Sequence, residues 1–157
     1  MAHDQLRLPS PQIEANPEGD QLVGLPTWLW LDDGAWGPVS AVASVPGVSV
    51  RAVARPARVE WAMGDGSTVR CDGPGTPYGS AGKSRTPGGP QGESPDCGHT
   101  YRTSSAGQRS SAFPVSATVH WAVTWAGAGE SGVFPGLTTT SYAAFRVAES
   151  QALNNEG

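Results

Sequence analysis

The chain has 157 residues, a formal net charge of −4 and a charged-residue content of 15%. This acidic, weakly charged composition excludes the basic surface that would bind the phosphate backbone of a nucleic acid. No apolar run reaches the roughly eighteen residues that a membrane-spanning helix needs, so we expect no membrane span. Glycine and proline number 21 and 14, which is typical of short strands joined by turns.

The two ends of the chain differ in composition from its middle. Residues 1–20 are polar and contain three prolines, so we expect a flexible N-terminal linker there. A single domain is expected over residues 21–150, followed by a polar C-terminal tail at residues 151–157. The first residues lack the apolar stretch of a signal peptide, and we expect that a signal segment of the native protein precedes this sequence.

Most of the middle of the chain consists of short segments that alternate between apolar and polar residues, as half-buried β-strands do. The longest alternation begins at Phe113 and ends at Trp125, with large apolar residues on one face only. Pro56 interrupts an earlier alternating stretch. The expected strands, in chain order, are residues 25–31, 36–45, 48–55, 58–63, 68–71, 113–125 and 137–149. This pattern predicts an all-β fold, as either a sandwich or a small barrel.

Cys71 and Cys97 are the only cysteines. They enclose a stretch rich in glycine, proline and serine, residues 72–96, and two cysteines around one irregular loop favour a disulfide bond. Two unrelated thiols in a cytosolic protein are the alternative, and a metal site is less well supported because no C-x-x-C spacing is present. A disulfide indicates an oxidising compartment, so we expect the protein to be extracellular or at the cell surface.

Two short motifs lie on either side of the cysteine-enclosed loop. One is W-x-x-G-D-G-S at residues 61–67 and the other is H-x-Y at residues 99–101; their defining residues are Trp61, Gly64, Asp65, Gly66, His99 and Tyr101. Together with the long alternating strand, these motifs resemble the polycystic kidney disease (PKD) domain, an immunoglobulin-like antiparallel β-sandwich. The resemblance extends over roughly residues 45 to 125 and implies this fold. The long disulfide-closed loop departs from the ordinary PKD pattern.

The resemblance also implies structural roles for the motif residues. Trp61 would lie in the core, and Asp65 would accept backbone N–H groups of its own turn, as aspartates in turns do. Tyr101 would occupy the position of the tyrosine corner of related sandwiches, and His99 would bond to backbone near the turn. The stretch between the turn and His99 is much longer than in ordinary PKD domains, and residues 23–45, with three tryptophans, also lie outside the PKD pattern.

The chain as a whole is similar to a group of secreted actinobacterial proteins that are often described as ATP- or GTP-binding. Its only trace of a P-loop is the sequence Gly82-Lys83-Ser84. The first glycine of a P-loop would fall at position 77, where the chain has Pro77. The prolines that follow exclude the helix on whose N-terminus the phosphates would rest. We therefore expect no nucleotide and no other cofactor.

Candidate catalytic side chains are present without a recognisable catalytic pattern. His99, His120 and Asp65 could belong to a hydrolytic site, but no G-x-S-x-G sequence marks a nucleophile. The carboxylates that a glycosidase or a calcium site would use are expected to be solvated groups of turns and exposed faces: Asp32, Asp33, Glu60, Asp65, Asp72 and Asp96. A pocket that joins His99 to two carboxylates would favour an enzyme; otherwise we expect no enzymatic activity and no bound metal.

Tryptophan is frequent, with six residues. Trp61, Trp121 and Trp125 are expected in the core because they fall on the inward faces of alternating segments. The first expected strand has bulky residues on both faces, so its two tryptophans and the one that follows it have two interpretations. The three residues concerned are Trp28, Trp30 and Trp36. They either pack in the core or form a surface that stacks on sugars or on another protein.

We therefore expect a non-enzymatic, extracellular or cell-envelope module that binds another protein or has a structural role. The cysteine-closed loop and exposed strand edges would present the binding surface. A carbohydrate-binding module that uses exposed tryptophans is the alternative, and an accessory domain of a hydrolase is less well supported. All three rest partly on analogy, since a fold by itself does not imply a function.

Overall fold

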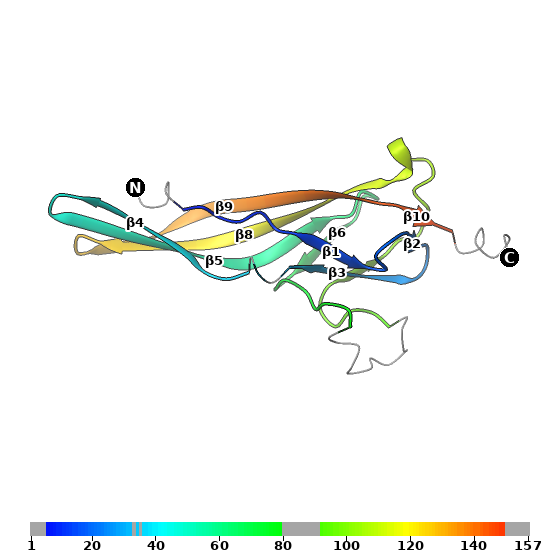
Figure 1. Ribbon diagram of the computed structural model, residues 1–157, viewed down its shortest axis with the longest axis horizontal. Helices are drawn as coiled ribbons and strands as arrows, with labels where there is room; N and C mark the ends of the chain where they lie inside the picture. The colour runs from blue at the N-terminus through cyan, green and yellow to red at the C-terminus, as the bar shows by residue number, and fades with distance from the viewer. Residues whose placement is uncertain (1–5, 33, 35, 80–91, 150–157) are drawn as a thin grey trace.

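The computed structural model describes residues 6–32, 34, 36–79 and 92–149, which form an all-β structure (Figure 1). Its strands, in chain order, are β1 (Ile13–Asn16), β2 (Gln21–Leu22), β3 (Pro26–Leu31), β4 (Val39–Val45), β5 (Val48–Ala62), β6 (Thr68–Cys71), β7 (Gly98–Thr100), β8 (Phe113–Gly127), β9 (Glu130–Phe145) and β10 (Val147–Ala148). A short 3₁₀ helix, η5 (Arg109–Ser111), precedes β8. The tail expected at residues 151–157 and the Gly82-Lys83-Ser84 sequence lie outside the described residues. Within the described part, no helix has the length and apolar character needed to cross a membrane.

The largest sheet has five antiparallel strands in the order β4-β5-β8-β9, with β6 beside the second half of β5. The sequence predicts two strands separated by Pro56, and this prediction is wrong. β5 is one strand of 15 residues, and its pairing with β8 shifts register between Pro56 and Arg58. The strand continues because a local irregularity in the ladder accommodates a residue that has no backbone N–H group.

The alternating sequence of β8 forms the strand that it predicts. Its inward positions from Phe113 to Val123 are buried, and the residues between them are half-buried or exposed. Trp125, near the end of the strand, is only half-buried. Trp61 of β5 is completely buried and pairs with Ala117 of β8. Alternation has this effect because successive side chains of a strand point to opposite faces of the sheet.

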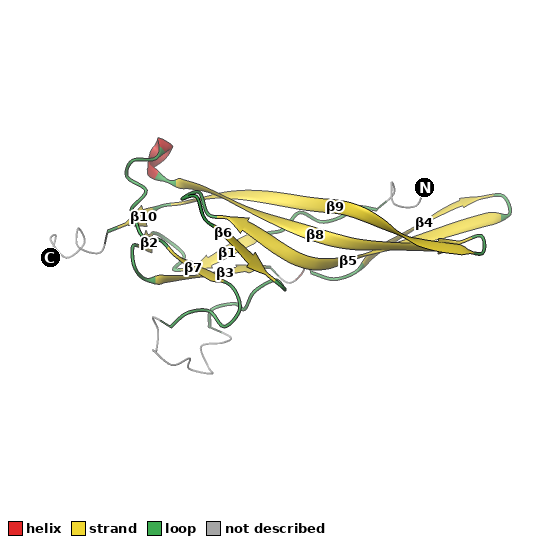
Figure 2. Ribbon diagram, turned by 180° about the vertical axis from the view of Figure 1, so that it is seen from behind, coloured by secondary structure: helices red, strands yellow, loops and turns green. Residues whose placement is uncertain are grey.

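A second sheet has three antiparallel strands in the order β1-β3-β7. Leu29 and Leu31 of β3 belong to the same hydrophobic core as Trp61 and Val119 of the larger sheet. Residues of both sheets therefore contribute to one hydrophobic core. β2 and β10 add a short parallel pair near the C-terminal end of the described chain (Figure 2).

The N-terminal segment is part of this fold, so the expectation of a flexible linker over residues 1–20 is wrong for the described residues. β1 pairs along its length with β3. Leu6 is 9% exposed and belongs to the core, and Leu8 packs against it. Isolated apolar residues between prolines form no periodic pattern, but their side chains still cover apolar surface and remove it from water.

The molecule is elongated. Figures 1 and 2 show that the hairpins β4–β5 and β8–β9 extend well beyond the three-stranded sheet. The three-stranded sheet lies toward the other end, together with the described ends of the cysteine-enclosed loop (Figure 1). The two sequence motifs also lie there, because one begins in the last two residues of β5 and the other in the last two residues of β7.

Candidate binding cleft beside the disulfide

Cys71 and Cys97 form a disulfide bond, as the sequence predicts. The bond joins the last residue of β6 to the residue before β7, and both half-cystines are buried. It therefore connects the five-stranded sheet to the three-stranded sheet. In the chain-entropy treatment, closing a loop of this size contributes about 3 kcal/mol to stability.

Both described ends of the cysteine-enclosed loop lie against β3. The carbonyl oxygen of Pro74 accepts a hydrogen bond from the N–H of Leu31 at 2.8 Å. The ring of Tyr78 lies edge-on to that of Trp28, with centroids 5.0 Å apart. Trp28 Nε1 also donates to the carbonyl oxygen of Gly92 at 2.9 Å. β3 is therefore covered by the core on one face and by the loop on the other.

This covering corrects the assignment of Trp28 to a possible ligand surface. Trp28 is only 2% exposed and presents no free face to a sugar or a partner. Trp30 is half-buried, and a Cβ atom at Gly75 would lie 2.9 Å from its Cα atom, so the loop passes directly over it. Trp36 is half-buried and packs against the core. Alternation within the strand cannot reveal this, because the covering residues come from another part of the chain.

The side chain of Asp65 stabilises the turn of residues 64–67, as the sequence predicts. Asp65 Oδ1 accepts a hydrogen bond from the N–H of Ser67 at 3.0 Å. Gly64 has a φ of 82° and lies so close to Phe113 and Pro114 that a side chain there would collide with them. The motif therefore fixes the conformation of the turn against the start of β8.

The second carboxylate oxygen of Asp65 binds His99. His99 Nε2 lies 2.9 Å from Asp65 Oδ2, and the two side chains are 12% and 14% exposed. Partial burial works to raise the pKa of Asp65, but the hydrogen bonds from His99 and from the Ser67 backbone outweigh it, and the net pKa is lowered. The expectation that His99 bonds to backbone is therefore wrong: it bonds to the carboxylate of the turn.

Tyr101, which follows β7, is completely buried. Its hydroxyl donates to the carbonyl oxygen of Met63 at 2.9 Å, and its ring stacks on Phe113 and lies edge-on to His99. Burial raises the pKa of this hydroxyl. A tyrosine corner bonds to backbone a few residues upstream, whereas this acceptor lies 38 residues upstream. The hydroxyl therefore joins two sheets instead of closing a local turn.

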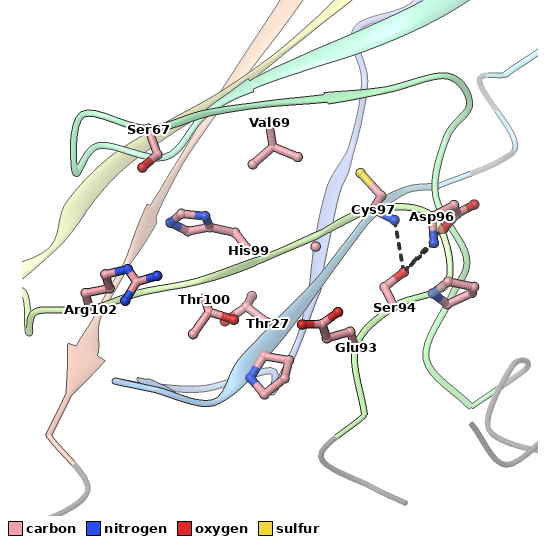
Figure 3. Close-up of a pocket in the computed structure, with 13 residues that line it drawn as sticks. Thr27, Ser67, Val69, Glu93, Ser94, Asp96, Cys97, His99, Thr100 and Arg102 are labelled. Atoms are coloured by element: carbon pink, nitrogen blue, oxygen red, sulfur yellow. Dashed lines mark hydrogen bonds between the residues drawn. The ribbon is translucent and has the colours of Figure 1, made fainter. Parts of the chain in front are cut away.

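A cleft of about 620 Å³ opens between this turn, β7 and the end of the cysteine-enclosed loop. Most of the residues that line it are polar. Figure 3 shows His99 between the turn that carries Ser67 and the segment that carries Thr100, with Arg102 at one end and Asp96 at the other. The cleft therefore gathers hydroxyl, imidazole, carboxylate and guanidinium groups from three parts of the chain.

The cleft joins His99 to two carboxylates, Glu93 and Asp96, which is the arrangement that would favour an enzyme. Asp96 instead accepts hydrogen bonds from the hydroxyls of Ser94 and Thr76 at 3.2 and 3.1 Å, and His99 Nε2 is engaged by the turn. Among the described residues, no hydrogen bond joins a serine or threonine hydroxyl to His99, as a nucleophile and its base would require. These polar groups hold the walls of the cleft in place.

His120 does not reach the cleft. It lies on the outer face of the five-stranded sheet, as alternation predicts, with Nε2 2.9 Å from Glu60 Oε1. Arg70 Nη2 lies 2.9 Å from the other carboxylate oxygen. Hydrogen bonds from His120 and Arg70 lower the pKa of Glu60. Strand register brings the three side chains together, so a strand-by-strand interpretation of the sequence does not link them.

The remaining candidate carboxylates lie apart from the cleft. Asp32 Oδ1 accepts a hydrogen bond from the N–H of Gly34 at 3.0 Å, and Asp72 is exposed. Asp33 lies outside the described residues. Within the described ranges, no three acidic, histidine or cysteine side chains are grouped as the ligands of a metal ion would be.

Comparison with known proteins adds no relative: no protein-family model matches the chain, and no curated protein or solved structure gives a significant match. The function must therefore be inferred from the cleft and the strand edges themselves.

Proposed function

We propose that this chain is a non-enzymatic protein-binding module of the extracellular space or the cell surface, and that its cleft beside the disulfide binds the partner. The observation that carries this proposal is the cleft: about 620 Å³ lined mostly by polar residues, on two sheets that a buried disulfide connects. A surface that is already ordered loses less conformational entropy when it binds, so its contacts convert more fully into affinity.

The charges of the cleft favour a polar peptide segment or loop as the ligand. Arg102 and Glu93 are exposed, have opposite charges and both line the cleft. Neither forms an ion pair with another described residue. A partner segment with one acidic and one basic side chain would pair with both, and such electrostatic complementarity selects the partner and its orientation.

The surroundings of His99 favour binding over catalysis. Asp65 engages one nitrogen of its ring, and the ring lies edge-on to the buried Tyr101 with centroids 4.7 Å apart. These contacts fix the imidazole as a part of the scaffold. A general base lies within hydrogen-bond reach of the group that it activates, and the described hydrogen-bond partner of His99 is a carboxylate, which needs no activation.

The same proposal includes an immunoglobulin-like sandwich of the PKD type. Two sheets that contribute to one core, the buried Trp61 and the turn held by Asp65 support it. This chain differs from the PKD-type sandwich in two features, the hydrogen bond of Tyr101 between the two sheets and the long loop of residues 72–96. The proposed location rests on the disulfide, because structural disulfides persist in oxidising compartments and are rare in the cytosol.

Affinity capture with matched variants tests the proposal. Immobilised wild-type protein is incubated with secreted and envelope proteins, and the retained proteins are identified by mass spectrometry. Arg102→Ala and Glu93→Ala should each lose the specific partner, because each removes one charge from the cleft. Arg109→Ala is the matched control, since Arg109 is also exposed but lies in the 3₁₀ helix outside the cleft lining. It should retain the partner.

The captured material also separates the alternatives. A partner that binds all three variants as tightly as the wild type would overturn the assignment to the cleft. Retention of a polysaccharide instead of a protein, with loss on Arg102→Ala, would change the ligand class to a glycan. Circular dichroism of each variant checks that the fold is intact, which is expected because all three side chains are exposed.

A further inference from the structure

One edge of each main sheet has no strand partner in the described structure. β9 pairs with β8 on one side along nearly its whole length, and no described strand pairs with its other side. β1 pairs with β3 on one side and likewise ends the three-stranded sheet. A strand edge of this kind presents unpaired backbone N–H and C=O groups that can pair with another extended chain.

The two edges border the same groove. It has a volume of about 590 Å³ and is lined by residues 11–14, the last two of which begin β1, and by residues 140–143 of β9. Figure 1 shows the N-terminal segment running beside β9 toward β1. Cα atoms of β1 and β9 approach within 8 Å, so an extended segment would lie along the β9 edge with β1 next to it and would not pair with both strands.

Residues 137–145 of the β9 edge lack the features that usually protect strand edges from pairing, whereas Pro135 and the register shift opposite Trp121 and Val123 lie before them. Natural edges carry charged residues, prolines or bulges that prevent association. Residues 137–145 of β9 contain no charge and no proline, and are rich in threonine and aromatic residues, which are favourable in strands. Nine extended residues span roughly 30 Å, which is long enough for several ladder hydrogen bonds.

An exposed aromatic side chain marks the groove. Tyr142 lines it and is 80% exposed, more than the other large hydrophobic residues described as exposed. Large exposed aromatic groups are common anchors of protein interfaces, because they bury much apolar area while the hydroxyl remains hydrogen-bonded. A ligand strand beside β9 would cover this ring.

The charge at the groove indicates the chemistry of the occupant. Glu14 is the only charged residue that lines it, is exposed, and has no ion pair with another described residue. A basic side chain in the ligand would complement it. A second copy of the same surface would bring another Glu14 and no cation, so charge disfavours a symmetric dimer through this groove.

We propose that the groove between β1 and β9 binds an extended peptide segment that carries one basic residue and no other charge, by β-augmentation of the β9 edge. The peptide backbone pairs with residues 137–145, and its basic side chain pairs with Glu14. This inference rests on the proposal that the chain is a protein-binding module, but it uses residues outside the cleft, so the two can fail separately.

Selection from a phage-displayed library of random linear peptides on the wild-type protein tests the inference. Enriched peptides should share β-branched residues and one lysine or arginine. Glu14→Lys should weaken their binding about fivefold, the upper scale of one exposed ion pair, and Tyr142→Ala should weaken it too. Glu130→Lys carries the same charge change at the tip of the β8–β9 hairpin and should leave the affinity unchanged.

Hydrogen exchange locates the bound peptide. The expected result is new protection of amides within residues 137–145. Protection of residues 93–102 instead would support the cleft as the binding site and overturn this inference. An affinity for the peptide that Glu14→Lys leaves unchanged would also overturn it. Failure to enrich any peptide would overturn it as well. A wild-type dimer in sedimentation velocity that Tyr142→Ala dissociates would identify a second copy as the occupant and exclude the peptide.

Discussion

His99 Nε2 lies 2.9 Å from Asp65 Oδ2, although 34 residues separate the two in the chain. The contact joins β7 of the three-stranded sheet to the turn after β5 of the five-stranded sheet. The disulfide and the Tyr101 hydroxyl bond make further cross-sheet connections in the same region. One wall of the candidate cleft is therefore built from three different kinds of bond between the two sheets.

The ionised Asp65 side chain is expected to make stability depend on acidity. Because folding lowers its pKa from the ordinary 3.8, the carboxylate stabilises the folded state above pH 3.8. This contribution is lost as the pH falls through the lowered pKa. Asp65→Asn should be less stable than the wild type at neutral pH and should lose less stability on acidification. Urea unfolding at a series of pH values measures both effects.

Asp72→Asn is the matched control, because Asp72 is an exposed aspartate without a described hydrogen bond through its side chain. It should keep the acid dependence of the wild type. A wild-type acid dependence in Asp65→Asn would show that the pair with His99 does not contribute to stability.

Removing the Tyr101 hydroxyl should destabilise the protein without changing its packing. Tyr101→Phe leaves the ring on Phe113 but deprives the carbonyl oxygen of Met63 of its donor. A lost buried hydrogen bond of this kind costs about 1–2 kcal/mol. Denaturant unfolding should show this decrease with an unchanged m-value, while Tyr142→Phe, at an exposed tyrosine, should change stability by less than about 0.5 kcal/mol.

Replacing the disulfide should release the loop as well as lower stability. Cys71→Ser with Cys97→Ser should reduce the free energy of unfolding by about 3 kcal/mol. The loop should also move away from Trp28, which it covers, and acrylamide should then quench tryptophan fluorescence more strongly. The added quenching should disappear when Trp28→Phe is combined with the cysteine variants. Added quenching that persists there would come from another tryptophan and contradict the covering role of the loop.

Two glycines of the loop allow the contact with β3 to be tested separately from backbone strain. Gly75 and Gly79 have φ values of 93° and 102°, so alanine is strained at both, by about 1–2 kcal/mol. A side chain at Gly75 would also collide with Trp30, whereas Gly79 has open space around it. Gly75→Ala should therefore unfold at a lower urea concentration than Gly79→Ala. Equal urea midpoints for the two variants would mean that the loop shifts away from Trp30 without losing stability.

Several features could be predicted because they depend on residues close together in the chain. The inward positions of β8 follow from strict alternation, and the turn bond from Asp65 to Ser67 spans two residues. The disulfide could be predicted from two cysteines around one irregular loop. Pro56 misled the assignment of β5, because the bulge that accommodates it depends on the partner strand β8.

The all-β class, the alternating strand β8 and the disulfide-closed loop could be predicted from the sequence, since they follow from local alternation and composition. The bounds of β5 and β9 could not, because both strands continue through positions where the sequence predicts a break. The burial of Trp28, the bond between His99 and Asp65, and the groove bordered by β1 and β9 became visible in the folded structure alone. The physical reason is that these relationships join distant segments. They form only after the shared core has brought particular strand edges and loops together, and no local pattern of residues encodes that arrangement.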